Sequence, residues 1–137
     1  MSDHWSDWAN YIISQSVEQC SKVNLTDKSH TSIWNTLHTF EIDSDNLKVL
    51  AEPFNSSNHP SGIKVDNIKF MYVKKIEDNV ALYVQMGGSE DTKQTILSML
   101  GKEYAIITLL PPKSNTRTVI NVCHDVMKKL ILNANLD

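Results

Sequence analysis

Apolar side chains recur about one helical turn apart in three stretches of the chain: residues 2–20, 41–54 and 116–132. Each stretch begins near a residue suited to an N-cap, such as Asp43 or Ser44 for the second and Ser114 or Asn115 for the third. Pro53 marks the end of the second stretch. The pattern predicts two long terminal helices and a shorter helix between them.

Stretches of apolar and β-branched residues predict the strands. Seven stretches have this character: residues 22–25, 31–34, 63–65, 68–74, 80–85, 95–100 and 104–110. A loop of Asn, Ser, His and Pro, residues 55–61, precedes the last five. The connections between these five are too short for a parallel crossover. The order predicts an α+β fold in which helices cover a central antiparallel sheet of about six to seven strands.

Length and composition favour one domain over residues 1–137. A content of 41% hydrophobic and 21% charged residues is typical of a chain that forms a packed core. The net charge of −3 disfavours a nucleic-acid-binding protein, because such binding relies on excess positive charge. No apolar run reaches the length of about 18 residues that spans a bilayer, and no signal-peptide pattern is present. We expect no transmembrane segment and no export.

The two cysteines indicate a reducing compartment. Cys20 and Cys123 fall on the apolar side of predicted helices, without the spacing of a metal site or a redox motif. Two cysteines are also too few for a disulfide scaffold. We therefore expect two reduced, packed thiols in the cytoplasm.

Motifs for catalysis and cofactor binding are missing from the sequence. It has no Gly-rich phosphate loop, nucleophile elbow, His-Glu-x-x-His or calcium loop, and its five histidines lack the spacing of metal ligands. His124 follows Cys123 directly, but helical neighbours point about 100° apart, so the two do not form a nucleophile and base. We expect a protein that is not an enzyme and needs no cofactor or metal.

Two aromatic residues of the first predicted helix face away from its apolar stripe. Trp8 and Tyr11 lie about 105° and 165° from the centre of the stripe, which contains Trp5. Exposed rings one turn apart form a receptor for polyproline II segments, and Trp34 would complete a three-ring surface. The alternative is that a second helix or the chain end covers these rings.

The last predicted helix has a continuous polar face made of Asn121, His124, Asp125 and Lys128. Mixed charge of this kind is typical of a solvated helix face. It also suits one rim of a protein interface that includes Lys74 and Arg117. The residues alone leave both interpretations open.

Short motifs, in their order along nearly the whole chain, resemble the profilin family. They are Trp8-Ala9-Asn10-Tyr11-Ile12, Ser32-Ile33-Trp34, Gly62-Ile63-Lys64-Val65, Lys69-Phe70 and the amphipathic last helix. The resemblance implies a cytoplasmic, cytoskeleton-associated protein whose N- and C-terminal helices pack on one face of the sheet, with a smaller helix on the other. It also implies regulation of filament assembly by binding monomeric actin, proline-rich segments of actin-assembly factors and phosphoinositide headgroups.

The resemblance assigns site residues position by position. For the polyproline groove it implies Trp8, Tyr11, Trp34 and Lys129. The family usually adds a His and a terminal aromatic residue to this groove, whereas this chain has Lys128-Lys129-Leu130 and ends in Asn135-Leu136-Asp137. For the actin surface it implies Lys74, Tyr83, Gln85, Asn115, Arg117, Asn121, His124 and Asp125. The few clustered basic residues for phosphoinositides are Lys64, Lys69, Lys74 and Lys75.

Two other interpretations fit the same sequence. An antiparallel sheet flanked by helices also suits a regulatory sensor domain that encloses a small molecule in an internal pocket. A profilin-like protein with weakened actin binding fits the loop at residues 113–117, which lacks the Gly-containing sequence often found there in the family. An enclosed pocket would favour the sensor, and accessible aromatic rings over a filled core would favour the adaptor.

Overall fold

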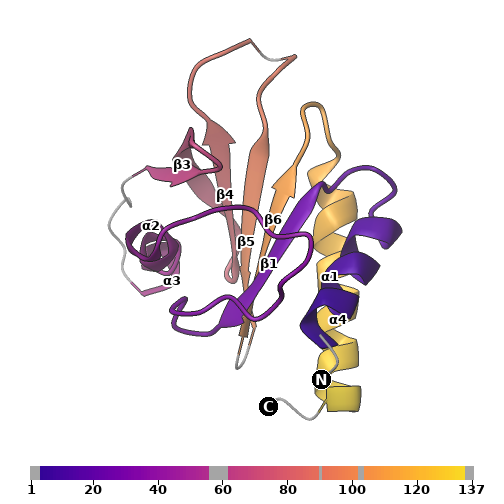
Figure 1. Ribbon diagram of the computed structural model, residues 1–137. Helices are drawn as coiled ribbons and strands as arrows, with labels where there is room; N and C mark the ends of the chain where they lie inside the picture. The colour runs from indigo at the N-terminus through magenta and orange to yellow at the C-terminus, as the bar shows by residue number, and fades with distance from the viewer. Residues whose placement is uncertain (1–3, 56–61, 90, 102–103, 135–137) are drawn as a thin grey trace.

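A six-stranded antiparallel sheet runs through the middle of the molecule (Figure 1). The computed structural model describes residues 4–55, 62–89, 91–101 and 104–134. In chain order the elements are α1 (His4–Gln15), β1 (Lys22–Asp27), α2 (Ser44–Val49), α3 (Glu52–Asn55), β2 (Ile63–Val65), β3 (Ile68–Glu77), β4 (Val80–Gln85), β5 (Thr95–Leu100), β6 (Tyr104–Leu110) and α4 (Thr116–Ala134). The strands lie in the order β1-β6-β5-β4-β3-β2, and each neighbouring pair is antiparallel.

Helices cover both faces of the sheet. α1 and α4 lie side by side on one face, and α2 and α3 lie on the other (Figure 1). Each face buries its own core: the first contains Ile12, Leu25, Leu97, Val119 and Cys123, and the second contains Phe40, Leu47, Phe70, Tyr83 and Ile107. The α+β class, the antiparallel sheet and the division of the helices between its faces are confirmed.

The stretches of apolar and β-branched residues predict most of the sheet correctly. β2, β4, β5 and β6 have the predicted bounds. β2 and β3 are joined by Asp66 and Asn67, whose φ angles of 50° and 65° are both positive, as a type I′ hairpin turn requires. β3 runs on to Glu77, three residues beyond its predicted end at Lys74.

Two register shifts in β3 decide which way its charged side chains point. Both shifts lie between Tyr72 and Glu77, and each leaves one extra residue in β3. An extra residue reverses the alternation of side chains across the sheet. Lys74 therefore lies opposite Leu82 and Glu77 opposite Val80, two β4 residues on the face covered by α1 and α4.

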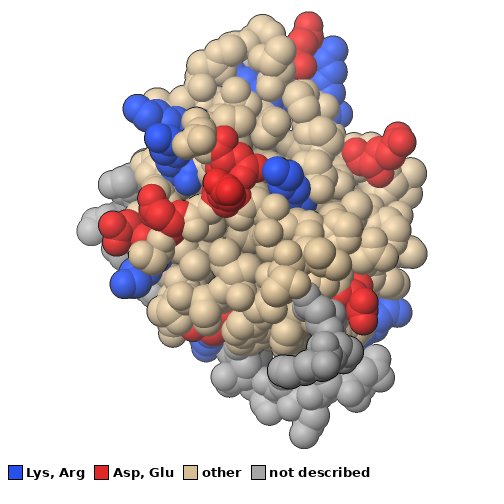
Figure 2. All heavy atoms as spheres, in the orientation of Figure 1, with Lys and Arg blue, Asp and Glu red and all other residues tan. Residues whose placement is uncertain are grey.

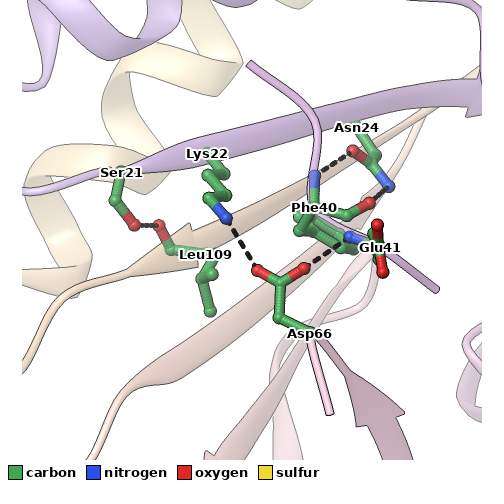
Figure 3. A network of polar contacts seen from close by, with 7 residues as sticks. All are labelled: Ser21, Lys22, Asn24, Phe40, Glu41, Asp66 and Leu109. Atoms are coloured by element: carbon green, nitrogen blue, oxygen red, sulfur yellow. Dashed lines mark hydrogen bonds and ion pairs between the residues drawn. The ribbon is translucent and has the colours of Figure 1, made fainter. Parts of the chain in front are cut away.

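Side-chain contacts join the two edges of the curled sheet (Figure 3). Lys22 of edge strand β1 forms an ion pair of 2.9 Å with Asp66, which follows edge strand β2. The chain between these edges is fixed at both sides: Asn24 pairs with the backbone N–H and C=O of Phe40, and Asp66 accepts a hydrogen bond from the N–H of Glu41. The segment at residues 40–41 thus closes the gap between β1 and β2.

The first predicted helix is too long. α1 ends at Gln15 rather than at residue 20, because the chain turns through positive φ angles at Val17 and Glu18. Val17, an apolar residue within the predicted helix, is 70% exposed. Cys20 is buried as expected, but it lies between α1 and β1 rather than in a helix.

Two further predictions also differ from the structure. Residues 31–34 form no strand, and only an isolated bridge joins Ile33 to Thr26. The helix predicted over residues 41–54 is split into α2, which Asp43 caps, and α3. Pro53 lies within the first turn of α3, where its missing N–H costs no helical hydrogen bond. Of the loop predicted at residues 55–61, Asn55 ends α3 and the rest lies outside the described residues.

Candidate functional site

Four aromatic rings gather where α1 meets the segment that follows β1. Trp5, Trp8 and Tyr11 lie on α1, and Trp34 lies on that segment. The ring centroids of Trp5 and Trp34 are 4.7 Å apart with 42° between the planes, and those of Trp8 and Tyr11 are 5.9 Å apart in an edge-to-face arrangement. All four side chains are half-buried at the margin of the core beneath α1 and α4. We call these four residues the aromatic surface.

The burial of these rings differs from the sequence prediction in two ways. Trp8 and Tyr11, expected to face outward, pack partly against the core and remain partly exposed. Trp5, expected in the buried stripe, is also half-buried and stacks on Trp34. A ring that is packed on one side and open on the other is held in position and still accessible. The surface therefore has one ring more than the sequence predicts.

A buried hydroxyl fixes the segment after Trp34 to α1. The hydroxyl oxygen of Ser6 accepts hydrogen bonds from the backbone N–H groups of Thr36 at 3.0 Å and Leu37 at 2.9 Å. Ser6 is only 3% exposed. Since buried hydrogen bonds are costly to leave unmade, this contact holds Trp34 beside Trp5.

The side chain of Asn35 attaches the same segment to the sheet. Its Oδ1 accepts from the N–H of Leu25 at 2.9 Å, and its Nδ2 donates to the C=O of Val23 at 2.8 Å and of Leu37 at 2.9 Å. The backbone N–H of Trp34 also donates to the C=O of Leu25 at 2.7 Å. Asn35 thus satisfies backbone groups on the outer edge of β1 that an additional strand would otherwise use.

A polar contact links the aromatic surface to α4. The Tyr11 hydroxyl donates to Oδ2 of Asp125 at 3.0 Å, and Lys129 Nζ lies 3.5 Å from the same oxygen. Lys129 Nζ is also 5.7 Å from the centroid of the Tyr11 ring, within the range of a cation–π contact. The carboxylate of Asp125 raises the pKa of Lys129. Asp125, expected on the actin surface, therefore lies with Lys129 beside the aromatic surface.

A second group of side chains lies where the end of β3 meets α4. Glu77 accepts from Arg117 Nη1 at 2.9 Å and contacts His124 Nε2 at 2.9 Å, each through a different carboxylate oxygen. These hydrogen bonds, that of Arg117 first, lower the pKa of Glu77. Asn121 is exposed on α4 and Lys74 is exposed on β3. We call Lys74, Glu77, Arg117, Asn121 and His124 the strand–helix surface.

Basic and apolar side chains extend this region along β3. Met71 and Val73 are 49% and 42% exposed. Lys64 and Lys69 are exposed partners across β2 and β3. Because side chains alternate along a strand, Lys69 and Met71 project from the face opposite to the buried Phe70. The sheet beyond α4 thus presents an open face on which exposed apolar residues lie among lysines.

Of the three remaining residues predicted for the actin surface, Tyr83 and Gln85 lie on the other face of the sheet and Asn115 caps α4. Tyr83 is fully buried in the core beneath α2, so its side chain is not accessible to a partner, and this burial raises its pKa. Gln85 lies two residues along the same face of β4 and accepts a hydrogen bond from the N–H of Gln94. Asn115 is exposed, but its Oδ1 accepts from the N–H of Thr118 at 3.2 Å and so caps α4.

Sequence reasoning missed Trp5, Ser6, Asn35 and Glu77 among the residues that form or position the site. Trp5 carries a usable signal, because residues three apart on a helix form one ridge and Trp5, Trp8 and Tyr11 have this spacing. Ser6 has no local signal, since its partners lie 30 and 31 residues away. Glu77 lies in a polar stretch whose composition predicts a hairpin turn. The register shifts in β3 direct its side chain toward α4, and no glycine in the sequence indicates these shifts.

No other chemistry stands out among the residues that the structure describes. They contain no group of His, Cys, Asp and Glu that could hold a metal ion. None of their helices is both long enough and apolar enough to cross a membrane. Cys20 and Cys123 are free and buried, and burial raises the pKa of both thiols, that of Cys20 to about 12. Thiols with raised pKa values are poor nucleophiles.

Two hollows formed by described residues are open to solvent. One of about 470 Å³ is lined by Ile33, Phe40, Glu41, Ile42, Asp43, Lys64 and Asn67. Another of about 360 Å³ lies beside β2 and includes Lys64, Lys69 and Met86. Exposed side chains border both, so neither is the enclosed pocket that a small-molecule sensor needs. Figure 2 shows charges of both signs interspersed on the face seen in Figure 1.

Comparison with known proteins identifies a family. The family model described as Profilin matches residues 4–135. A search of curated proteins finds no match.

Solved profilin structures share the fold of this chain. Acanthamoeba castellanii profilin IA superposes with a TM-score of 0.67 at 15% identity, over 93% of this chain and 98% of that one. Mouse profilin IIa, in complex with a double repeat from the FH1 domain of mDia1, gives 0.69 at 6% identity, over 93% and 96%. A LokiProfilin1/rabbit actin complex gives 0.63 at 20% identity, over 95% and 96%. At such low identity the likeness is one of fold.

Proposed function

The chain belongs to the profilin family, and we propose that it binds monomeric actin and recruits proline-rich segments of actin-assembly factors. In this proposal the aromatic surface holds the proline-rich segment and the strand–helix surface contacts actin. The protein acts as a non-enzymatic adaptor that regulates filament assembly. We place it in the cytoplasm, which suits its two free, buried cysteines.

The gathering of half-buried rings from α1 and from Trp34 is the observation that carries the proposal. Polyproline II segments bind in aromatic grooves with little loss of entropy, because the ligand is already extended. The rings here are also held in advance by the hydrogen bonds of Ser6 and Asn35, which reduces the cost of ordering the site. The solved complex of mouse profilin IIa with an FH1 double repeat supports this assignment by family.

The region around β3 and α4 suits a larger protein partner. Exposed Met71 and Val73 supply apolar area, and Lys74, Arg117 and Asn121 lie around it as charged and polar groups. Protein interfaces commonly combine an apolar centre with a polar rim. The LokiProfilin1/rabbit actin complex, which has the same fold, supports actin as this partner.

The two surfaces leave room for both partners at once. His124 and Asp125 are neighbours on α4, and the first contacts Glu77 of β3 while the second contacts Tyr11 of α1. Helical neighbours point about 100° apart, so α4 serves each surface with a different side. By family resemblance, such an adaptor also promotes nucleotide exchange on actin and restrains spontaneous nucleation.

Phosphoinositide headgroups are a third proposed partner, with weaker support. Lys64, Lys69 and Lys74 are exposed along β2 and β3 and would offer positive charge to phosphate groups. Lys75 lies opposite Ala81, which is buried in the core on the other face. The four lysines named from the sequence therefore do not act as one cluster in this proposal.

Titration of two variants tests the assignment of the surfaces. Trp8→Ala should weaken binding of an oligoproline peptide by about 2 kcal/mol or more, roughly 30-fold, because truncating a central interface aromatic has this effect. Lys74→Glu should weaken binding of monomeric actin and leave peptide binding unchanged. Isothermal titration measures the first, and the rate of pyrene-actin assembly measures the second.

Tyr72→Ala is the matched control for Trp8→Ala, because it truncates a half-buried ring on the other face of the sheet. It should leave peptide affinity unchanged. Equal peptide affinity in Trp8→Ala and the native protein would overturn the assignment of the groove. Failure of the native protein to alter actin assembly at high excess would instead favour a profilin-like protein that has lost strong actin binding.

A further inference from the structure

Trp5 gives the aromatic surface a second pair of stacked rings. The Trp5 and Trp34 rings are 4.7 Å apart, whereas Trp8 pairs with Tyr11 at 5.9 Å. All four are half-buried, so none is sealed in the core. Trp5 lies one helical turn before Trp8, on the side of the α1 start. The two ring pairs therefore follow one another along α1.

We propose that Trp5 is a fourth ring of the proline-binding surface and lengthens the peptide that this chain recognises by one turn of polyproline II helix. This inference rests on the proposed binding of proline-rich segments and adds a residue that sets the length of the ligand. In this proposal the Trp5 ring contacts the bound peptide as well as the core.

The spacing of the rings on α1 matches the repeat of the ligand. Trp5 and Tyr11 are six residues apart, which corresponds to about 9 Å along a helix axis at about 1.5 Å per residue. A polyproline II helix repeats every three residues at about 3.1 Å each, so equivalent prolines are also about 9 Å apart. Measured along the axis of α1, the separation of Trp5 and Tyr11 thus matches one turn of the ligand, while the two rings lie about 120° apart around the helix, so the ligand crosses α1 at an angle.

Buried hydrogen bonds also hold the part of the aromatic surface that contains Trp5. Ser6, the next residue, is 3% exposed and accepts hydrogen bonds from the N–H groups of Thr36 and Leu37, which brings the Trp34 segment against the start of α1. Trp5 and Trp34 are therefore fixed relative to one another before any ligand arrives. A pre-formed subsite loses little entropy on binding.

An exposed apolar side chain continues the surface beyond this ring pair. Leu37 is 59% exposed, and its N–H is bound to Ser6, which places it beside the start of α1. Leu37 thus adds exposed apolar surface near the start of α1, whereas Tyr11 lies further along the helix. This continuity with the proposed groove indicates that one extended segment covers both ring pairs.

Peptides of graded length separate this role from a role in folding. Blocked oligoprolines of about 6, 9 and 12 residues, which differ by one polyproline II turn each, are titrated into the native protein and into Trp5→Leu. We expect native affinity to keep rising at a length where that of Trp5→Leu has levelled off. For the longest peptide, the variant should bind about tenfold more weakly, a typical effect of losing an interface aromatic. For the shortest peptide, the two should bind alike.

Two further variants keep the test decisive. Trp5→Phe retains an aromatic ring and should restore most of the affinity for the longest peptide. Val17→Leu, at a 70% exposed position just past α1, should behave as the native protein. If Trp5→Leu weakened all lengths by the same factor, or none, the inference would be wrong while the proposed groove would stand. If the native protein bound no oligoproline of any length, both would fall.

Discussion

The aromatic surface and the strand–helix surface share α4 but are held by different kinds of interaction. Ser6 and Asn35, which fix the first, are each 3% exposed and make uncharged hydrogen bonds. Glu77, which organises the second, pairs with Arg117 and His124, whose side chains are 55% and 41% exposed. Breaking a buried hydrogen bond costs about 1–3 kcal/mol, whereas an exposed ion pair contributes about 0–1 kcal/mol. The first surface is therefore the more rigid of the two.

This difference suggests that the aromatic surface recognises its partner by shape and the strand–helix surface by charge. Rings held by buried contacts present a fixed shape, which suits a ligand that is itself stiff. Exposed ion pairs can exchange partners at low cost, so Arg117 and His124 can leave Glu77 for a bound protein. We expect substitutions at the first surface to cost stability and those at the second to alter mainly the response to salt and pH.

Asn35→Ala should have the largest effect, because it removes three hydrogen bonds at once. The backbone N–H of Leu25 and the C=O of Val23 and Leu37 would all lose their partner. We expect the free energy of unfolding to fall by about 3 kcal/mol, as measured by urea denaturation. Oligoproline affinity should fall as well, since only backbone contacts, such as the bond from the Trp34 N–H to the Leu25 C=O, would then attach the Trp34 segment to β1.

Ser32→Ala provides the control for Asn35→Ala. Ser32 is exposed on the same connection, and only its backbone N–H makes a described hydrogen bond, to Asp27. Its substitution should leave stability and peptide binding nearly unchanged. Equal stability of Asn35→Ala and Ser32→Ala would contradict the claim that buried hydrogen bonds hold the aromatic surface.

Tyr11→Phe tests the contact that joins the two regions. It keeps the ring and removes the hydroxyl that donates to Asp125. We expect a loss of about 1 kcal/mol in unfolding free energy, because the bond reaches a charged group but is exposed. A double-mutant cycle with Asp125→Asn should give a coupling energy of about 0.5 kcal/mol or more. Strict additivity of the two substitutions would show that the hydroxyl and the carboxylate do not interact in solution.

The pattern of hydrophobic residues predicts the strands and helices whose position depends on which of their own residues are buried. β4, β5 and β6 end where their apolar run ends, since these central strands are buried at consecutive positions and need a continuous apolar sequence. The pattern fails where the backbone leaves the regular path without a glycine. The positive φ angles at Val17 and Glu18 end α1 early, and no residue type there signals a left-handed conformation.

The candidate site is predictable only in part, for a related reason. Residue types and spacing mark Trp8 and Tyr11 as candidates, because aromatic rings on a polar helix face are unusual, and Trp34 is added as a third ring outside the helix. The family resemblance places Tyr83 on the actin surface, yet its side chain lies in the core beneath α2. The direction in which the Glu77 side chain points depends on register shifts in β3, which arise from pairing with β4 and not from the local sequence.

Ionic strength should affect the two proposed partners differently. Lys74 and Arg117 are exposed cations on the strand–helix surface, and charges in water are screened beyond about 10 Å at 0.1 M salt. We expect actin affinity to fall several-fold on going from low to physiological salt, while oligoproline affinity changes less than about twofold. Arg117→Gln should flatten the salt dependence of actin binding. Equal salt slopes for both partners would place charge at the aromatic surface too, at Asp125 and Lys129.

The smallest expected effect is the pH dependence of the Glu77 contacts. Arg117 and His124 lower the pKa of Glu77 in the folded protein, so the unfolded chain takes up the proton more readily. The contribution of Glu77 to stability is therefore present above its unfolded pKa of about 4.3 and is lost as the pH falls through the lower folded value.

Glu77→Gln should cost less than about 1 kcal/mol near neutral pH, because the pair is largely exposed. This difference from the native protein should shrink in acid, as followed by urea denaturation at several pH values, whereas Glu41→Gln, at an exposed carboxylate elsewhere, should show no such convergence. A gap that widened in acid would mean that Glu77 is stabilised in its protonated form, against the geometry of its contacts with Arg117 and His124.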